Sequence, residues 1–539
     1  MPVSRPVWQL TTSGGQLGRS AAICHGGLPP VKTNSSHGPR ARPQHQLQES
    51  LQPRPPRSAY LHLPFCHRRC FYCDFPVVPL GDRADGEGSA SIAAYLELLL
   101  AEIAHAPQGP PLATVYFGGG TPSLLTPGQI GGLLRALAQR FGLAAGAEVT
   151  LELDPASFDQ RRLAGYLALG INRVSLGGQS FDDAVLAGLG RRHRGQDLRQ
   201  AAGWLRQAQA RGDLRSWSLD LIQGAPLDGP AWADSAARPS PFGSGSRPAL
   251  AVPGPRSAPV DSGPRSAPAV PGARPAPAVP CARPAPAVPC ARPAPAVPCA
   301  RPAPAVLEHW RGQLEQAIAL APPHLSIYDL TIEPGTVFDR WLSQGRLSLA
   351  DDEVAADLHA LSRQLLVAAG YGHYEISNYA WPGHASRHNR VYWSGAAWWG
   401  FGMGASSGLG GERLARPRNR EAYGHWLAEW IRQRQGQPDA AAPRGAFPLD
   451  ERLMVGLRQR EGVNLERLWR EHDLPAAWQV ELRQRLAGFE AAGLLRVEGP
   501  RWRLSDPEGL ALSNAVLRDL LAWWSPRDPL AEPAMNAER

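Results

Sequence analysis

The chain has 539 residues, with 56 Lys and Arg against 48 Asp and Glu, which gives a formal net charge of +8. Residues 1–57 contribute +6 and residues 238–306 contribute +7, so the rest of the chain stands at −5. The charge therefore argues against a basic nucleic-acid-binding surface, and the lack of any run of 18 apolar residues excludes a membrane-spanning helix.

Residues 1–57 have no apolar stretch of the kind found in secretory signals. The segment is rich in Arg and poor in acids, as transit peptides are, but its Pro, Gly and His residues would break an amphipathic helix. We therefore expect a disordered extension. Outside this extension and the repeat at 238–306, the chain has three cysteines, which indicates a reducing, cytoplasmic environment.

Six short runs rich in β-branched and aromatic residues alternate with helical stretches. The predicted strands are 59–63, 114–117, 148–153, 173–176, 216–222 and 324–330. The predicted helices lie near 90–105, 127–141, 158–169, 196–211 and 307–321. Strands that alternate with helices indicate parallel βα units. The predicted fold class is therefore α/β, a (βα)6 partial barrel of the TIM-like kind.

The strongest chemical signal directly follows the first predicted strand. Cys66, Cys70 and Cys73 form a C-x3-C-x2-C triplet. Three thiolates at this spacing can bind three irons of a [4Fe–4S] cube and leave the fourth iron open. The alternative is a zinc knuckle, which usually has two C-x2-C pairs or a paired His. The chain has no second pair, so we favour the cluster.

Glycine-rich and polar segments follow the next predicted strands. They are Gly118–Pro122, Glu152 with Asp154, Gly177–Phe181, Arg191–His193 and Asp220. The carboxyl ends of parallel strands meet at one edge of a sheet, where such folds bind their ligands. Each segment alone could be an ordinary turn or cap, but their recurrence at one edge predicts a binding site there.

A low-complexity segment interrupts the chain after the fifth predicted strand. Residues 238–306 contain 20 prolines and repeat the nonapeptide Ala-Arg-Pro-Ala-Pro-Ala-Val-Pro-Cys. This proline density excludes helices and central strands, so we expect a disordered or polyproline-like insert that loops into solvent. Its boundaries are ambiguous between about 229 and 306.

The last part of the chain, roughly residues 445–525, has a different order of predicted elements. Two or three helices precede short β-like runs at 493–497 and 502–504. This order predicts a small winged-helix-like α+β domain. Such domains often bind DNA, but no basic recognition helix stands out here, so nucleic-acid binding remains the least favoured function.

These segments together resemble the radical S-adenosylmethionine (SAM) superfamily, and within it the coproporphyrinogen III oxidase-like branch with the HemW heme chaperones. The resemblance covers about residues 58–525 apart from the insert. The sequences that carry it are YLHLPFC at 60–66 with the Cys triplet, YFGGGTPS at 116–123, SLGGQSF at 175–181 and IYDLTIEPGT at 327–336.

The resemblance implies roles for the matching residues. Cys66, Cys70 and Cys73 would ligate the [4Fe–4S] cluster, and the amino and carboxylate groups of SAM would chelate its open iron. Gly119, Gly120 and Thr121 would line the methionine end of SAM. The further implied SAM contacts are Tyr60, Glu152, Gln179, Arg191 and Asp220.

Two features separate the branches of this family. The oxidases carry a fourth cysteine at the place of Phe75, whereas the chaperones resemble this chain there. The chaperones also carry an H-N-x-x-Y-W string, which is present at 388–393 among six Trp of residues 381–430. Aromatic side chains and a histidine could hold a porphyrin, with His388 as the candidate iron ligand. The alternative for His388 is a hydrogen-bonded histidine of a packed core.

We therefore predict a cytoplasmic chaperone that binds haem and delivers it to apo-haemoproteins, respiratory ones among the candidates. Oxygen-independent coproporphyrinogen III oxidation is the alternative, so enzyme activity stays open. An electron donor is expected as a partner, while a homodimer and peripheral membrane contact are left open. The predicted segments are the 1–57 extension, the barrel at 58–228, the insert at 229–306, the barrel end with the aromatic region at 307–440, the C-terminal domain at 441–525 and the tail at 526–539.

Overall fold

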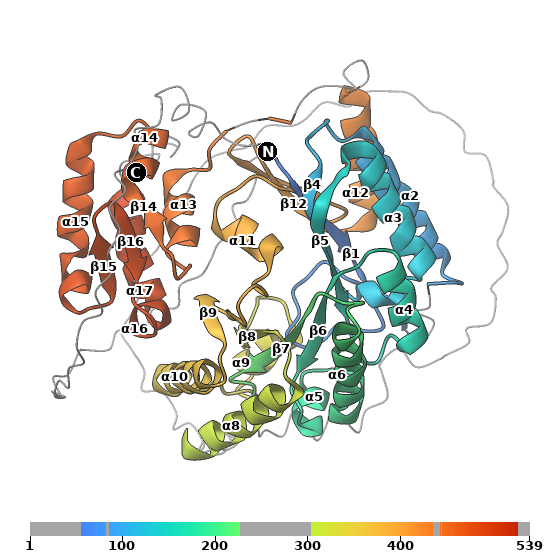
Figure 1. Ribbon diagram of the computed structural model, residues 1–539, viewed down its shortest axis with the longest axis horizontal. Helices are drawn as coiled ribbons and strands as arrows, with labels where there is room; N and C mark the ends of the chain where they lie inside the picture. Colours follow the sequence, from blue (N-terminus) through green and yellow to red (C-terminus); the bar gives the residue numbers. More distant parts are fainter. Residues whose placement is uncertain (1–54, 82–85, 227–302, 435–441, 444, 526–539) are drawn as a thin grey trace, which may run out of the picture.

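The computed structural model describes residues 55–81, 86–226, 303–434, 442–443 and 445–525 (Figure 1). Nearly all of the predicted N-terminal extension and most of the insert lie outside these residues, as does all of the tail at 526–539. The disorder predicted for these three segments therefore stays a prediction. Helix α8 begins at Ala303, so the residues from 303 to 306 belong to a helix rather than to the insert.

A nine-stranded sheet forms the centre of the larger unit, in the order β11-β1-β4-β5-β6-β7-β8-β10-β9. The six predicted strands are confirmed, and neighbours among them pair in parallel. They are β1 (Ser58–Leu63), β4 (Leu112–Gly119), β5 (Leu143–Leu153), β6 (Arg173–Gln179), β7 (Ser216–Gln223) and β8 (His324–Asp329).

Helices cover the outer face of this sheet (Figure 1). The covering helices are α2 (Ala90–His105), α3 (Pro127–Phe141), α4 (Gln160–Ala168), α5 (Asp183–Gly188), α6 (Gly195–Ala210), α8 (Ala303–Leu320) and α10 (Asp352–Ala368). Side chains of Ser89, Thr126 and Asp159 accept backbone N–H groups and start α2, α3 and α4. No helix within the described ranges is both long enough and apolar enough to cross a membrane.

Three strands of the sheet were not predicted. β11 (Trp399–Phe401) pairs in parallel with β1, whereas β10 (Asn378–Ala380) and β9 (Gly372–Glu375) extend the other edge in antiparallel order. Each has four residues or fewer, which is too short for a clear alternation of polar and apolar residues. The partial barrel is therefore wider than predicted.

Shorter elements complete this unit. They are β2 (Phe65–Cys66), β3 (Val78–Pro79), the 3-10 helix η2 (Pro122–Leu124), α9 (Val337–Ser343), α11 (Arg387–Trp393), β12 (Ser406–Leu409), β13 (Glu412–Ala415) and α12 (Arg420–Gln433). β2 and β3 pair with each other at the start and end of the cysteine loop. β12 and β13 form an antiparallel hairpin next to β11.

The C-terminal unit has its own core and a three-stranded antiparallel sheet, as expected for a winged-helix-like α+β domain. Its elements are α13 (Leu449–Gly456), β14 (Val463–Asn464), α14 (Leu465–Glu471), α15 (Ala476–Ala491), β15 (Leu495–Glu498), β16 (Arg501–Leu504), α16 (Glu508–Ala511) and α17 (Ser513–Trp524). Two arginines of α15 pair with acids, Arg483 with Glu490 and Arg485 with Asp519. These ion pairs reduce the positive charge that a recognition helix would need.

A buried carboxylate fixes the added strand β11 to the helical layer. The side chain of Glu102 on α2 is fully buried. It accepts hydrogen bonds from the Arg416 guanidinium at 2.8 Å, the Tyr423 hydroxyl at 2.6 Å and the backbone N–H of Gly402 at 2.8 Å. One carboxylate thus joins α2, α12 and the segments on either side of the β12–β13 hairpin.

We predict that Glu102→Ala destabilises the fold by about 3–5 kcal/mol, because the buried Arg416 guanidinium would lose its counter-charge. Urea unfolding followed by circular dichroism measures this change. The control is Glu97→Ala, which removes an exposed carboxylate from the same helix. Equal unfolding midpoints for the two variants would contradict the role given to Glu102.

Candidate functional site

The cysteine loop begins directly after β1, at the edge where the parallel strands end. Cys66, Cys70 and Cys73 are free thiols of intermediate exposure. Thr121, from the glycine-rich loop after β4, donates its hydroxyl to the Cys66 Sγ at 3.6 Å. Arg191 Nη1 lies 3.8 Å from the Cys70 Sγ. Segments that follow three different strands therefore meet at the triplet.

The thiols of the triplet are held in a poorly solvated place. Burial is the largest influence on Cys66 and raises its pKa to about 12, although the hydrogen bond from Thr121 opposes this. Burial also raises the pKa of Cys73. Within the described residues, no three His, Cys, Asp or Glu side chains converge on one metal position. Cysteines that each bind a different iron of a cube need not converge on one ion.

The glycines after β4 allow the backbone to approach β1 closely. A Cβ at Gly119 would lie 2.8 Å from the His62 ring, and Gly119 itself has a φ of 121°. A Cβ at Gly120 would lie 2.7 Å from the carbonyl oxygen of Phe65. Only glycine fits these positions without displacing the backbone, so the loop is built to bring its N–H and carbonyl groups next to the cysteines.

A buried glutamate ties this loop to the next strand. Glu152 on β5 accepts the Tyr116 hydroxyl at 2.9 Å and the backbone N–H of Gly119 at 3.1 Å. Burial raises the pKa of Glu152 to about 7, and its two hydrogen bonds oppose the shift. Tyr60 stacks on Tyr116 with 6.0 Å between ring centroids. Tyr60, Gly119 and Glu152, predicted from separate motifs, therefore form one group.

A second group lies beside Cys70. Arg191 Nη2 donates to the Asp154 carboxylate at 2.7 Å and to the Gly177 carbonyl oxygen at 2.9 Å. The charge of Arg191 lowers the pKa of Asp154 against the opposing effect of burial. Asp154 had no predicted role, although its position at the end of a strand beside Glu152 was the signal that could have identified it.

The fourth and fifth strands supply the last two predicted residues. Gln179 adopts a φ of 62°, a left-handed conformation that is unusual for a residue other than glycine, where the β6–β7 register shifts. Asp220 accepts hydroxyl groups from Ser175 at 2.7 Å and Ser218 at 2.8 Å. Burial raises the pKa of Asp220. Gln179 ends β6, and Asp220 lies on the adjacent strand β7. Glu152 lies on β5, the other neighbour of β6, and Arg191 follows β6 in the chain.

His388, the predicted haem-iron ligand, lies away from the cysteine triplet and packs on Tyr116, with 5.1 Å between the ring centroids. It is 1% exposed, and its two ring nitrogens lie 2.8 Å from the Thr114 hydroxyl and 2.9 Å from the Tyr392 hydroxyl. Burial lowers its pKa to about 3, so the ring is neutral. Thr114 lies near the start of β4, at the other end of the barrel from Cys66. Iron ligation by His388 would require one of these two hydrogen bonds to break, and the role stays a prediction.

Comparison with family models gives two matches. Residues 60–219 match the Radical SAM superfamily, and residues 448–511 match the HemN C-terminal domain. The first range holds the triplet, the glycine-rich loop and Arg191. The second lies within the C-terminal unit.

Several curated proteins are similar over most of their length. The heme chaperone HemW of Synechocystis is 35% identical over 493 residues, which is 87% of this chain and 97% of that protein. HemW of Escherichia coli is 33% identical over 65% of this chain and 70% of its own length. The bovine "Radical S-adenosyl methionine domain-containing protein 1, mitochondrial" is 29% identical over 88% of this chain and 90% of that protein.

Among solved structures, coproporphyrinogen III oxidase (HemN) from Escherichia coli aligns with a TM-score of 0.58. The alignment covers 89% of this chain and 93% of that protein at 19% identity. At this level of identity the likeness shows a shared radical SAM fold, and says nothing about a shared reaction.

We predict that Glu152 makes stability fall as the pH rises. Its pKa is raised from 4.5 to about 7, so the folded state binds more protons than the unfolded state between these values. The contribution of Glu152 to the free energy of unfolding is complete below pH 4.5. It is lost as the pH rises to 7, and the loss is at most about 3 kcal/mol. Glu152→Gln removes the titration, so the wild type should lose stability relative to this variant between pH 5 and 8 as measured by urea unfolding.

The matched control is Glu315→Gln, which changes an exposed carboxylate of α8. Its stability should follow that of the wild type at every pH, because the histidines that also titrate in this range are common to both proteins. A constant difference between wild type and Glu152→Gln across this pH range would contradict the raised pKa.

Proposed function

Since the chain belongs to the HemW family of radical SAM heme chaperones, we propose that it holds a [4Fe–4S] cluster and SAM at the carboxyl edge of its barrel and binds haem for delivery to apo-haemoproteins. The identity to curated HemW proteins supports the family and the chaperone function. The site geometry supports the residues that we propose as cofactor ligands, and the family supports the partners.

The residues at the triplet fit a cluster. Cys66, Cys70 and Cys73 would each bind one iron, and such a cluster, when bound, supplies an open iron for SAM and a source of one electron. The guanidinium of Arg191 beside Cys70 and the hydroxyl of Thr121 on Cys66 would stabilise thiolate sulfur. Burial raises the pKa of Cys66 and of Cys73, so cluster binding would release protons from these two thiols.

The residues around the triplet have the chemistry that SAM requires. Gly119 and Gly120 let the loop pack closely on β1, where the Gly119 N–H donates to Glu152 and the Gly120 N–H donates to the Leu63 carbonyl oxygen, and this packing would position the loop beside SAM. Asp220 on β7 carries a carboxylate suited to ribose hydroxyls, Gln179 ends the adjacent strand β6, and Tyr60 lies on β1. We infer that Arg191 and Glu152 orient the amino-acid end of SAM, either directly or through Asp154 and Gly119.

The observation that carries the choice of chaperone over oxidase is Phe75. It stands where the oxidases carry a fourth cysteine, and its side chain is 61% exposed. An exposed phenyl ring on the cysteine loop cannot bind iron or transfer a proton, whereas a thiol can. It offers an apolar surface beside the triplet instead.

The remaining partners follow from the family and from this chemistry. The protein would accept an electron from a donor in the cytoplasm, bind haem, and pass it to an apo-haemoprotein, with a homodimer as one form. The ion pairs on α15 support leaving nucleic acid out of the proposal. His388 is the proposed haem-iron ligand, and iron binding there would replace its hydrogen bond with the Thr114 or the Tyr392 hydroxyl.

We predict that Cys73→Ala abolishes the [4Fe–4S] absorption of anaerobically reconstituted protein, because the cube would lose one of its three protein ligands. Iron and sulfide analysis together with the visible spectrum measure this loss. Cys24→Ala, which changes a cysteine outside the described residues, is the control and should assemble the cluster fully. Retention of the cluster in Cys73→Ala would remove that thiol from the ligand set.

We also predict that reconstituted protein transfers haem and does not oxidise a porphyrinogen. Haem-loaded protein incubated with an apo-haemoprotein should give the recipient's Soret spectrum. The same protein with coproporphyrinogen III, SAM and a reductant should form no protoporphyrinogen. Formation of protoporphyrinogen together with 5′-deoxyadenosine would establish the oxidase reaction instead, and purified oxidase in a parallel reaction shows that the assay can detect it.

A further inference from the structure

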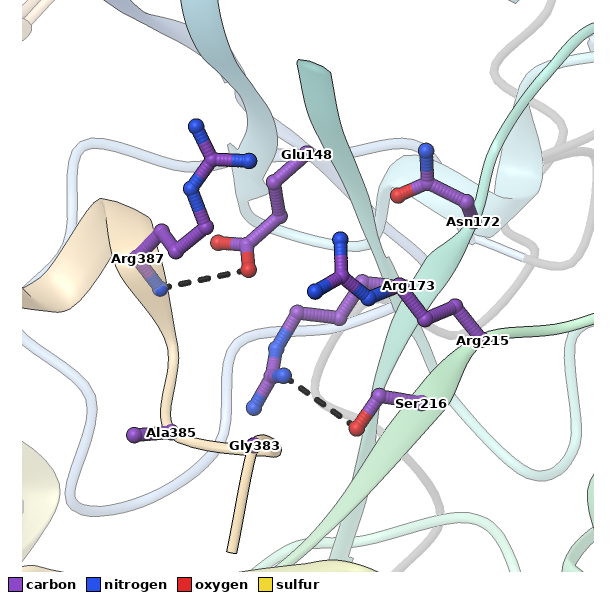
Figure 2. Close-up of a pocket in the computed structure, with 8 residues that line it drawn as sticks. All are labelled: Glu148, Asn172, Arg173, Arg215, Ser216, Gly383, Ala385 and Arg387. Carbon is purple, nitrogen blue, oxygen red and sulfur yellow. Dashed lines mark hydrogen bonds between the residues drawn. The ribbon is translucent and has the colours of Figure 1, made fainter. Parts of the chain in front are cut away.

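A pocket lies at the opposite end of the barrel from the cysteines, where the strands begin (Figure 2). The pocket is small, with a cavity volume of about 20 Å³, and it is open to solvent on one side. The lining residues are Glu148, Asn172, Arg173, Arg215, Ser216, Gly383, Ala385 and Arg387. They come from β5, from the starts of β6 and β7, and from the loop that leads into α11. None of the residues assigned to the cluster or to SAM lines this pocket.

The central side chain of the pocket is a buried arginine with unused hydrogen-bonding capacity. Arg173 is 4% exposed. Its Nη1 donates to the Ser216 hydroxyl at 3.2 Å and to the carbonyl oxygen of His384 at 2.9 Å. Its Nη2 is buried and has no hydrogen-bond partner among the described residues. A guanidinium removed from water normally has its donors satisfied by a carboxylate or another oxyanion.

The nearby acids are already occupied. Glu148 is the one carboxylate in the pocket lining, and its oxygens accept the backbone N–H groups of Arg387 at 3.2 Å and His388 at 2.9 Å. Asp220, deeper in the barrel, accepts two serine hydroxyls, and burial raises its pKa. Neither carboxylate accepts a hydrogen bond from Arg173, although the charge of Arg173 acts on Asp220 and lowers its pKa against burial.

The other titratable groups that face Arg173 are positively charged or neutral. Arg215 and Arg387 are exposed arginines that line the same pocket, and Figure 2 shows Arg215 beside Arg173. His384 lies against Ser216, and its pKa is lowered by burial and then by Arg173 and Arg215, so it is neutral near pH 7. His324, buried below, also has its pKa lowered by burial and Arg173. The pocket thus contains three guanidiniums and one engaged carboxylate.

We propose that this pocket binds a compact oxyanion, a carboxylate or a phosphate, between Arg173, Arg215 and Arg387. The planar guanidinium matches the oxygen spacing of both groups and binds them with charge-assisted hydrogen bonds. The oxyanion comes either from a free small molecule or from a propionate of haem. Binding of the free anion is independent of the proposed cluster and chaperone activities, so the two proposals fail separately.

Thermal unfolding of the full-length protein tests the proposal, with sodium phosphate or sodium acetate replacing chloride at constant ionic strength. We expect a saturable rise in the unfolding midpoint with at least one of the two anions. Arg173→Gln and Arg215→Gln should weaken the apparent affinity at least about tenfold, as expected for a lost hydrogen bond to a charged group. Arg206→Gln, which changes an exposed arginine on α6, is the control and should keep the wild-type response.

Arg215 is exposed, so its variant should fold and decides the outcome even where Arg173→Gln does not fold. The proposal is overturned if neither anion raises the midpoint of the wild type at tens of millimolar, or if Arg215→Gln responds as the wild type does. A competition arm separates the two sources. If haem displaces phosphate and haem dimethyl ester does not, the ligand is a propionate, whereas no displacement by haem identifies a free anion.

Discussion

The parallel pairing of β4, β5, β6 and β7 is the constraint on which the site depends. Parallel strands end at one edge, so motifs that are far apart in the sequence meet there. Glu152 also links two neighbouring strands at this edge, because its carboxylate accepts hydrogen bonds from the Tyr116 hydroxyl and the Gly119 N–H. Arg191 serves similarly, since it reaches Asp154, Gly177 and the sulfur of Cys70. Glu152 thereby fixes the glycine-rich loop, and Arg191 fixes the cysteine loop.

The two ends of the barrel are built differently. At the carboxyl edge, the cysteine loop carries half-buried thiols and the exposed Phe75. At the other end, α11 packs His388 against the start of β4 and its first N–H groups against Glu148. Arg173 lies beside this closure with its Nη2 buried and without a hydrogen-bond partner among the described residues. Cofactor chemistry and anion binding are therefore assigned to separate ends of one sheet.

The sequence predicted the long regular elements and the site motifs because each has a local signal. The six strands follow from their β-branched and aromatic runs, and Cys66, Gly119 and Arg191 follow from motifs at strand ends. The edge strand β11 could not be predicted, because three residues carry no periodicity and its pairing with β1 is a contact across more than 300 residues. The motif that contains His388 does not show which end of the barrel it faces, so its burial and the two hydrogen bonds of its ring nitrogens became visible only in three dimensions.

The central claim is that the cysteine triplet holds a cluster with one iron open to SAM. Electron paramagnetic resonance of the reduced, anaerobically reconstituted protein, recorded with and without SAM, tests it most directly. We expect a [4Fe–4S]⁺ signal whose g-values shift when SAM is added, because SAM would bind the iron that no cysteine occupies. A cluster signal that SAM leaves unchanged, or a protein that takes up zinc and no iron under the same conditions, would contradict it.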